Sequence, residues 1–280
     1  MRDGTELATG TDVRILLVGP PRLAAPLAAL GHEVLDAAAL APVAGPGRLL
    51  DVRPLWAALD PAPDLLLVVQ DLEASTLAYG IEDVPAPRVY WAIDVHLNWY
   101  WQRWYARLFD AVLVAQKDWV PLFTADGLPA RWLPWGAEDV FLDAPDGPRD
   151  LDLAFVGTVD AGTRPKRAAA VECLRARFGL RVFGATAAER LDAAATAAVY
   201  ARSKIVFNES VLGDVNFRVF EAMGAGALLL TEAVGKGLTD LFTTGVHLDT
   251  FEPATLVAQV ERRLADDAGR AGAGVRLTRA

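Results

Sequence analysis

The sequence has few of the residues that mark secreted or membrane-spanning proteins. A single cysteine, Cys173, occurs among 280 residues, which excludes an internal disulfide framework and fits a reducing compartment. Apolar runs such as residues 65–69 are much shorter than the roughly 20 residues that cross a bilayer. The first residues, MRDGTELATGTD, lack the basic start and apolar run of a signal peptide. We therefore expect a cytoplasmic protein without a transmembrane segment.

The chain also lacks an excess of basic residues and the familiar catalytic motifs. Its formal net charge is -9 and its pI is near 4.9, which argues against nucleic acid or an anionic membrane as a partner. No G-x-S-x-G, P-loop, H-E-x-x-H or Cys/His metal spacing is present, and GPPRLA after the first apolar run is not G-x-G-x-x-G. Serine hydrolases, P-loop NTPases and zinc enzymes therefore have no support.

The apolar pattern predicts two α/β domains. Hydrophobic residues make up 53% of the chain, and 280 residues are enough for two ordinary cores. Continuous apolar runs, which are typical of buried parallel strands, alternate with helical periods. In the first half, strands are expected at 13–18, 34–35, 65–69, 89–93, 111–115 and 131–133. This alternation predicts a doubly wound parallel sheet.

The pattern restarts near residue 151. LDLAFVGTV repeats the form of DVRILLVGP, an apolar run that ends on glycine. Expected strands follow at 180–183, 204–208 and 227–230, with helices at 165–178, 187–202 and 253–266. We predict a first domain over 1–140, a linker rich in Pro, Gly and Asp over 141–150, and a second domain over 151–280. Two Rossmann-like domains imply a cleft between them, with ligands beyond the carboxyl ends of the strands.

A basic loop follows the first strand of the second domain. The stretch GTVDAGTRPKR begins at Gly157 and opens a helix, with Pro165 near its start. Arg164, Lys166 and Arg167 gather where the helix dipole disfavours cations. An exposed basic helix start is the alternative, but this arrangement favours a site for a phosphate group, which amide and cationic donors would bind together.

The stretch NESVLGDVNFRVFEAMGAGALLLTEA, from Asn208 to Ala233, holds a second polar group. Asn216 is expected to cap a helix, on which Arg218 and Glu221 lie three residues apart. These two side chains form either an exposed ion pair or a site with Arg218 on a diphosphate and Glu221 on ribose hydroxyls. Helical spacing by itself leaves both interpretations open.

A third polar group lies in WAIDVHLNWYWQRW, at the carboxyl end of the fourth strand. We predict His96 as a catalytic base with Asp94 beside it, and Asn98 and Trp99 as acceptor-binding residues. The helix that follows is expected to bury an apolar stripe and to turn Gln102, Arg103 and Arg107 away from the core. The expected stripe consists of Leu97, Tyr100, Trp101, Trp104, Tyr105 and Leu108.

Several of these stretches, in the same order, resemble one family. VYARSKIVFNESVLGDVNFRVFEAMGAGALLLTEAVGKGLTDLFTTGVHL is similar to the donor-binding motif of GT-B glycosyltransferases, and most of all to CgeB-type spore-maturation glycosyltransferase-like proteins. YWAIDVHLN, VLVAQKDWV, WLPWGAEDVF and LAFVGTV also resemble that family, so the likeness covers residues 89–249. It implies a two-domain GT-B enzyme that takes a sugar from a nucleotide diphosphate donor without a metal. The donor would bind the second domain and the acceptor the first.

The resemblance also implies roles for single residues. Glu221 matches the glutamate that holds the nucleotide ribose, and Ser210 matches a small polar residue near the phosphates. A further glutamate that contacts the donor sugar in retaining families is replaced here by Gly213, with Asp214 beside it. The predicted donor-binding set is Gly157, Arg164, Lys166, Asn208, Ser210, Asn216, Arg218 and Glu221.

The function predicted from these residues is metal-independent glycosyl transfer, with a nucleotide sugar and an acceptor substrate as the partners and no cofactor. Arg164, Lys166 and Arg218 would stabilise the leaving diphosphate in place of a metal. Two alternatives are a nucleotide-sugar-binding or coat-assembly module without catalysis, and a nucleotide-sugar 2-epimerase. No feature of the sequence indicates an oligomeric state.

Overall fold

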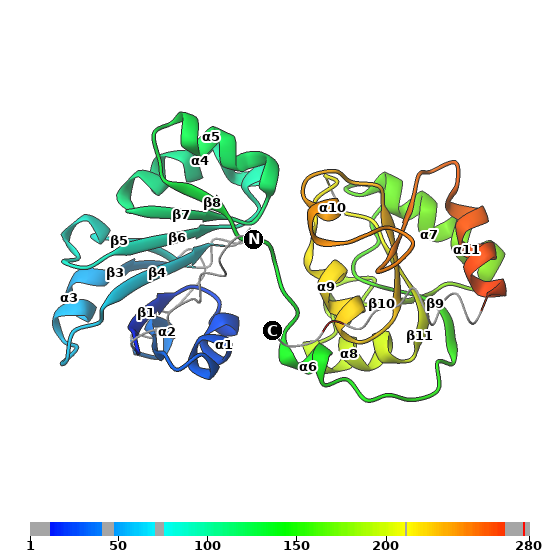
Figure 1. The fold of residues 1–280 in the computed structure, drawn as a ribbon, viewed down its shortest axis with the longest axis horizontal. Helices are drawn as coiled ribbons and strands as arrows, with labels where there is room; N and C mark the ends of the chain where they lie inside the picture. The colour runs from blue at the N-terminus through cyan, green and yellow to red at the C-terminus, as the bar shows by residue number, and fades with distance from the viewer. Residues whose placement is uncertain (1–11, 41–47, 71–75, 211, 267–276, 278–280) are drawn as a thin grey trace, which may run out of the picture. The chain divides into compact units, whose positions relative to one another are not determined.

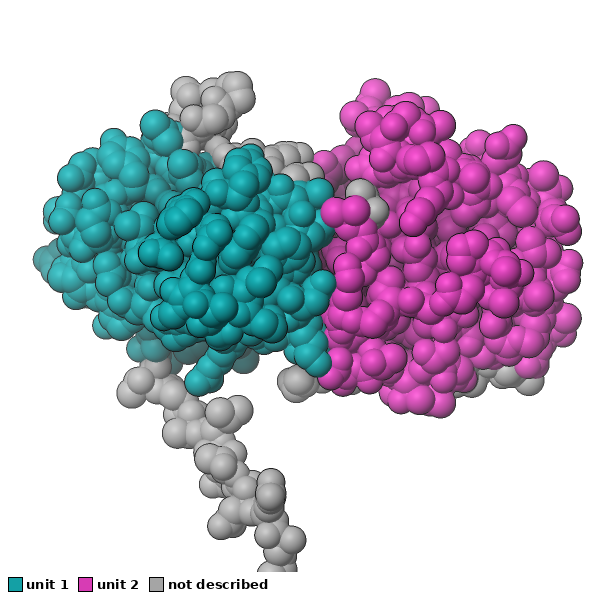
Figure 2. Space-filling view, turned by 90° about the horizontal axis from the view of Figure 1, so that it is seen from above, with its two compact units in different colours: residues 1–134 teal, residues 135–280 magenta. Residues whose placement is uncertain are grey.

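The computed structural model describes residues 12–40, 48–70, 76–210, 212–266 and 277. The chain divides into two compact units, residues 1–134 and residues 135–280, which Figure 2 draws in different colours. Each unit has its own parallel sheet and its own apolar core. The two units are described separately below (Figure 1).

The main sheet of the first unit has six parallel strands in the order β2-β1-β4-β6-β7-β8. These are β1 (Arg14–Val18), β2 (Glu33–Asp36), β4 (Leu65–Gln70), β6 (Arg88–Ala92), β7 (Ala111–Val114) and β8 (Ala130–Trp132). All six lie where the apolar runs predict them. Two further strands, β3 (Arg48–Asp51) and β5 (Thr76–Tyr79), pair in a small parallel sheet that the sequence pattern did not reveal.

Helices of the first unit follow the strands and cover the sheet. They are α1 (Ala24–Ala29), α2 (Ala37–Leu40), α3 (Val52–Ala57), α4 (Val95–Tyr105) and α5 (Val120–Ala125), with short 3-10 turns η1 (Pro21–Leu23), η2 (Ile81–Asp83), η3 (Ala106–Leu108) and η4 (Lys117–Trp119). Figure 1 shows α4 and α5 beside β7 and β8. The core of this unit includes Tyr90 of β6, Val95 of α4 and Phe123 of α5.

The sheet of the second unit is parallel in the order β10-β9-β11-β12-β13. Its strands are β9 (Leu151–Val156), β10 (Arg181–Phe183), β11 (Ser203–Asn208), β12 (Leu228–Glu232) and β13 (Asp249–Phe251). Its helices are α6 (Asp139–Leu142), α7 (Pro165–Phe178), η5 (Ala187–Glu189), α8 (Ala193–Ala201), α9 (Phe217–Gly224), α10 (Leu238–Leu241) and α11 (Leu256–Ala265). Parallel strands alternate with helices in both units, as predicted.

Residues 135–150, which include the predicted linker, belong to the second unit. Phe141 of α6 is 1% exposed and its ring lies 6.2 Å from that of Tyr200. Arg149 donates to the carbonyl oxygens of Tyr200 and Ser203, at 3.3 and 2.8 Å. A segment rich in Pro, Gly and Asp therefore packs on the second core through one short apolar helix and one arginine.

Candidate functional site

The carboxyl edge of the second sheet has the geometry that favours a ligand. The connections from β9 diverge there, because β10 lies on one side of β9 and β11 on the other. In open α/β sheets the crevice at such a switch point is where ligands bind. Gly157 follows β9, and Asn208 ends β11. Two of the predicted donor-binding residues therefore lie at this switch point.

Arg218, in the first turn of α9, joins the two strands at the switch point. Its Nε and Nη2 donate to the carbonyl oxygen of Val156, at 3.1 and 2.7 Å, and its Nη1 donates to Oδ1 of Asn208 at 2.5 Å. The guanidinium also lies 4.7 Å from the centre of the Phe155 ring, a cation–π contact. Arg218 is therefore bonded to both strands at the switch point, in contrast to an exposed salt-bridged helix face.

Gly157 has a backbone that only glycine adopts without strain, with φ of +142°. A Cβ at this position would lie 2.8 Å from Nη2 of Arg218 and 3.3 Å from Cζ of Phe155. The absence of a side chain is what lets Arg218 reach the end of β9.

Asn216 lies at the N-cap position of α9 but does not act as the predicted cap. No side chain caps this helix. Instead, Nδ2 of Asn216 donates to Oδ1 of Asn208 at 3.3 Å, and Nδ2 of Asn208 donates to Oγ1 of Thr231 at 2.9 Å. The capping expectation was wrong: the Asn216 side chain bonds to Asn208 through its nitrogen, and its Oδ1, the atom that would cap the helix, is buried without a hydrogen-bond partner among the described residues.

The basic loop ends at the start of α7, as predicted. Pro165 occupies the first turn of α7, and no side chain caps the helix. Nη1 of Arg164 donates to Oγ1 of Thr158 at 2.9 Å, whereas its buried Nε has no hydrogen-bond partner among the described residues. Lys166 is exposed. Uncapped amides and cations thus meet at one helix start, an arrangement that suits an anion.

Arg167 and Glu209 form a buried ion pair that the sequence did not predict. Nε of Arg167 lies 2.9 Å from Oε2 of Glu209, and their side chains are 6% and 7% exposed. Burial lowers the pKa of Arg167, and the positive charges of Arg218 and Arg164 lower it further. Burial raises the pKa of Glu209, opposed by the nearby Arg167. No local spacing signals this pair, since its members are 42 residues apart.

Ser210 and Glu232 shape the loop between β11 and α9. Oε2 of Glu232 accepts from the amide and the hydroxyl of Ser210, at 3.2 and 3.3 Å. The Ser210 hydroxyl in turn accepts from the amide of Asp214 at 2.9 Å. Gly213 has φ of +66°, in the left-handed region of backbone conformation that residues other than glycine rarely adopt. The backbone of this loop therefore favours glycine at position 213.

Glu221 lies on α9, three residues after Arg218, and is half-buried. The phenol of the buried Tyr200 interacts electrostatically with Arg218 and Glu221. Burial raises the pKa of that phenol. The ribose-binding role of Glu221 stays a prediction.

Asp150 and Asp152, at the amino end of the second sheet, form ion pairs of their own. Asp150 lies 2.5 Å from Arg202, and Asp152 lies 2.6 Å from Lys204. Both carboxylates are thus at the opposite edge of the sheet from the crevice.

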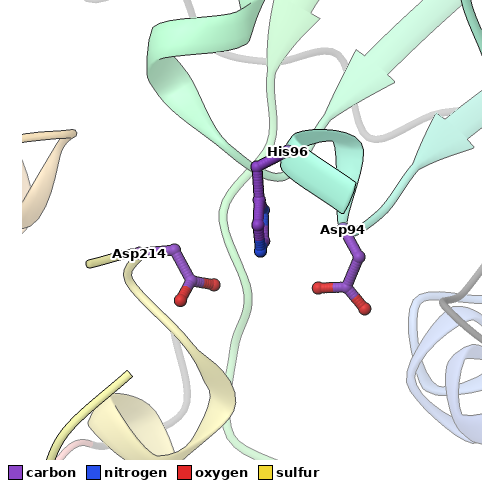
Figure 3. Close-up of side chains that lie close together, drawn as sticks. All are labelled: Asp94, His96 and Asp214. Carbon is purple, nitrogen blue, oxygen red and sulfur yellow. The ribbon is translucent and has the colours of Figure 1, made fainter. Parts of the chain in front are cut away.

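In the first unit, Asp94 and His96 lie at the carboxyl end of β6, as predicted (Figure 3). Asp94 has φ of 50° and ψ of 39°, a left-handed conformation that is uncommon for residues other than glycine. A carboxylate oxygen of Asp94 and a ring nitrogen of His96 lie within 4.8 Å of each other. Nδ1 of His96 has no hydrogen-bond partner among the described residues. Asp214, also drawn in Figure 3, belongs to the loop before α9 in the second unit.

The predicted orientation of the helix that follows β6 was partly wrong: Tyr105 and Leu108 pack against the core and Arg107 is exposed, as expected, but other positions differ. Gln102, expected on the outer face, is 0% exposed, whereas Tyr100 and Trp104 of the expected apolar stripe are 74% and 57% exposed. Trp99, predicted off the stripe, packs against the rings of Trp119 and Phe123, at 5.6 and 5.0 Å. Gln102 instead points to the end of β6, where its Nε2 donates to the carbonyl oxygen of Ile93, whereas Arg103 bonds to Asp126.

Asn98 is also engaged within the first unit. It is 6% exposed, its Oδ1 accepts from Nε1 of Trp101 at 3.1 Å, and its Nδ2 donates to the carbonyl oxygen of Asp94 at 3.4 Å. The acceptor-binding roles of Asn98 and Trp99 stay predictions, and the geometry around both side chains is that of packing.

Residues 164–279 match a family described as glycosyl transferase-like. A comparison with curated proteins gives no match. The matched part begins at the basic loop and includes α7, β11, α9 and β12. It therefore contains most of the donor site predicted from the sequence.

Solved structures resemble the chain over nearly its whole length. A glycosyltransferase from Rickettsia africae has a TM-score of 0.57 at 10% identity, and the match covers 95% of this chain and 92% of that chain. Sucrose-phosphate synthase from Thermosynechococcus elongatus has a TM-score of 0.58 at 14% identity, with coverages of 94% and 92%. HepE from Anabaena, in complex with UDP-glucose, has a TM-score of 0.55 at 12% identity, with coverages of 94% and 92%.

These similarities establish the class of fold. The chain has the α/β fold of GT-B proteins, with two Rossmann-like domains, as the sequence predicted. Within the described part of the chain, no helix combines the length and apolar character needed to cross a membrane.

Proposed function

We propose that this protein is a glycosyltransferase that moves a sugar from a nucleotide diphosphate donor to an acceptor without a bound metal. The observation that carries the proposal is the group of three arginines, Arg164, Arg167 and Arg218, at the switch point of the second sheet. Only one salt bridge among the described residues, that of Arg167 with Glu209, pairs a member of this group. An anion such as a diphosphate would balance the remaining positive charge.

The donor would bind across the carboxyl edge of the second sheet. Arg164, Lys166 and the first amides of α7 would hold the diphosphate, and Glu221 would accept from the ribose hydroxyls. Gly157, Asn208, Ser210, Asn216 and Arg218 would form the floor of this site. As the bond between the sugar C1 and the diphosphate oxygen breaks, fixed cations would stabilise the charge that develops on the leaving group.

On the acceptor side, His96 would take the proton of the acceptor hydroxyl while that oxygen bonds to C1 of the sugar. Its Nδ1 is buried and lacks a hydrogen-bond partner among the described residues, so no described group competes for that ring nitrogen. Asp94, within 4.8 Å of the ring, would stabilise the imidazolium that forms. The resemblance to CgeB-type proteins and a cytoplasmic location belong to the same proposal.

Binding of a nucleotide diphosphate tests the donor site. Isothermal titration with UDP and other nucleoside diphosphates is expected to find a ligand whose affinity falls about tenfold or more in Arg164→Ala, since a charge-assisted hydrogen bond contributes roughly 1.5–3 kcal/mol. Glu221→Ala is expected to weaken the same ligand. Arg202→Ala is the matched control, because Arg202 is an arginine of the same unit paired with Asp150 at the opposite sheet edge. Equal affinities in all variants would contradict the proposal.

Turnover separates glycosyl transfer from its two alternatives. The expected result is donor consumption only when an acceptor is present, followed by mass spectrometry of the glycosylated product. Conversion of the donor alone into its 2-epimer would identify an epimerase. Tight donor binding without turnover over a broad acceptor screen would identify a binding module.

A further inference from the structure

The turn between β6 and α4 is held by two buried glutamine side chains. This turn contains Asp94, whose left-handed conformation is otherwise strained by its side chain. One glutamine bonds to the peptide group before Asp94 and the other to the peptide group after it. A residue in a sparsely populated conformation persists only when its surroundings enforce that conformation.

Gln102 holds the peptide group that precedes Asp94. Its Nε2 donates to the carbonyl oxygen of Ile93 at 2.8 Å, and its side chain comes from the third turn of α4. Gln102 is 0% exposed. The helix that begins at this turn therefore also fixes the turn from within.

Gln116 holds the peptide group that follows Asp94. Its Oε1 accepts from the amide of Val95 at 3.2 Å, and it lies two residues beyond the end of β7, the neighbour of β6 in the sheet. Gln116 is 5% exposed. The amide of Val95 belongs to the first turn of α4, where no helix carbonyl is available, so a side-chain acceptor replaces one.

Each of the two glutamine side chains buries one polar atom without a hydrogen-bond partner in the described part of the chain. The hydrogen bond that each side chain makes to the turn must offset the free energy lost in this way. Oε1 of Gln102 and Nε2 of Gln116 are buried without a hydrogen-bond partner among the described residues. A buried amide group without a partner is unfavourable, and a leucine or methionine would fill the same space without that penalty. The one bond that each side chain makes to the turn is therefore the feature that distinguishes it from an apolar residue.

We propose that Gln102 and Gln116 are positioning residues that clamp the turn at Asp94 and thereby orient Asp94 and His96 for the acceptor step. The inference rests on the proposed function for the roles of Asp94 and His96, but the clamp itself is a property of the first unit. Small displacements of a catalytic group can reduce turnover about 100-fold, so a clamp of this kind would act on kcat.

Steady-state kinetics of Gln116→Leu and Gln102→Leu test the clamp. We expect kcat to fall about 10-fold to 100-fold while KM for the donor stays within about twofold, because the donor binds the second unit. Gln70→Leu is the matched control, since Gln70 is a glutamine at the end of β4 that is 1% exposed. Gln116→Met and Gln102→Met replace the leucine variants if those fail to fold. An unchanged kcat, or an equal loss in Gln70→Leu, would overturn the proposal.

Conservative variants separate a clamp from simple packing. Gln116→Glu keeps an oxygen that accepts from Val95 and is expected to restore most of kcat. Gln102→Met has no donor for the carbonyl of Ile93 and is expected to remain as impaired as Gln102→Leu. If Gln116→Glu is as impaired as Gln116→Leu, the hydrogen bond to Val95 is not the reason for the effect.

Amide hydrogen exchange distinguishes failure of the clamp from failure of the proposed function. By NMR, the amide of Val95 is expected to exchange at least about tenfold faster in Gln116→Leu than in the wild-type protein, and to be unchanged in Gln70→Leu. This readout needs no substrate. If the wild-type protein transfers no sugar but the Val95 amide still exchanges faster in Gln116→Leu, the proposed function is wrong and the proposed clamp is still supported. Equal exchange in wild type and Gln116→Leu would overturn the clamp whatever the activity.

Discussion

At the scale of single residues, the donor site depends on one glycine and one arginine. Arg218 reaches the carbonyl oxygen of Val156 only because Gly157 has no side chain. Both residues are in the donor set predicted from the sequence, but as separate ligands. The structure shows that they are coupled, since the glycine makes room for the arginine.

Gly157→Ala should therefore damage both stability and binding. A residue forced into such a backbone conformation costs about 1–3 kcal/mol, and the new Cβ would displace the Arg218 guanidinium. Urea unfolding and UDP titration measure the two effects. Gly147→Ala is the control, because a Cβ at Gly147 meets nothing within 4 Å. Equal stability and affinity in the two variants would show that the close approach of Gly157 and Arg218 is unimportant.

At the scale of elements, β6 and β7 are tied together at the end opposite to Asp94. Oδ2 of Asp110 accepts from the amide and Nε of Arg88, at 2.8 and 3.0 Å, and Oδ1 accepts from Nη2 at 2.6 Å. These bonds lower the pKa of Asp110 from its ordinary value of 3.8. The strand β6, which leads to Asp94, is thus held at both ends by side chains.

The stability of the first unit should depend on pH through Asp110. Because the folded pKa is depressed, its contribution is present above the unfolded pKa of 3.8 and is lost as pH falls through the lower folded value. Denaturant unfolding of wild type and Asp110→Asn from pH 7 to pH 2 is expected to show a difference that shrinks only below about pH 4. The Arg88→Met background should reduce that pH dependence, because the guanidinium is lost while the backbone amide of residue 88 still donates to Asp110. A difference that persists unchanged at pH 2 would contradict this account.

The α4 helix shows where element-level prediction fails. Its existence was predicted from the periodicity of aromatic residues, but it begins at Val95 instead of Leu97 and the face it buries was predicted only in part. Helical spacing reports which side chains share a face, whereas the choice of the buried face here depends on Gln102 and Trp99, which contact the end of β6 and α5. Those contacts join segments that the local pattern does not relate.

At the scale of the whole molecule, the boundary between the units lies at residue 134. Trp135 and Phe217 have ring centres 3.7 Å apart, and a Cβ on Gly224 would lie 3.1 Å from Cβ of Ala137. Composition predicted a linker over 141–150, because Pro, Gly and Asp are frequent there. Apolar residues before and within this segment pack on α8 and α9. The second unit therefore begins at residue 135 and not at residue 151.

Two fragments test this boundary. Residues 135–280 are expected to unfold cooperatively and to bind the nucleoside diphosphate found for the full chain. Residues 151–280 lack the buried Phe141, and loss of a buried phenylalanine costs roughly 3–5 kcal/mol. Thermal unfolding by circular dichroism compares them, and Phe141→Ala in the full chain isolates the side chain. Equal midpoints for the two fragments would show that residues 135–150 add no stability.

The sequence by itself determined the two α/β units and the location of the basic loop and of α9, because buried parallel strands require continuous apolar runs and glycines mark their ends. It also placed Asp94 and His96 after β6. Only the tertiary structure revealed the Arg167–Glu209 pair, the contact of Arg218 with β9, and the glutamines around Asp94. Each of these joins residues far apart in the chain, and the folded backbone decides which of them meet.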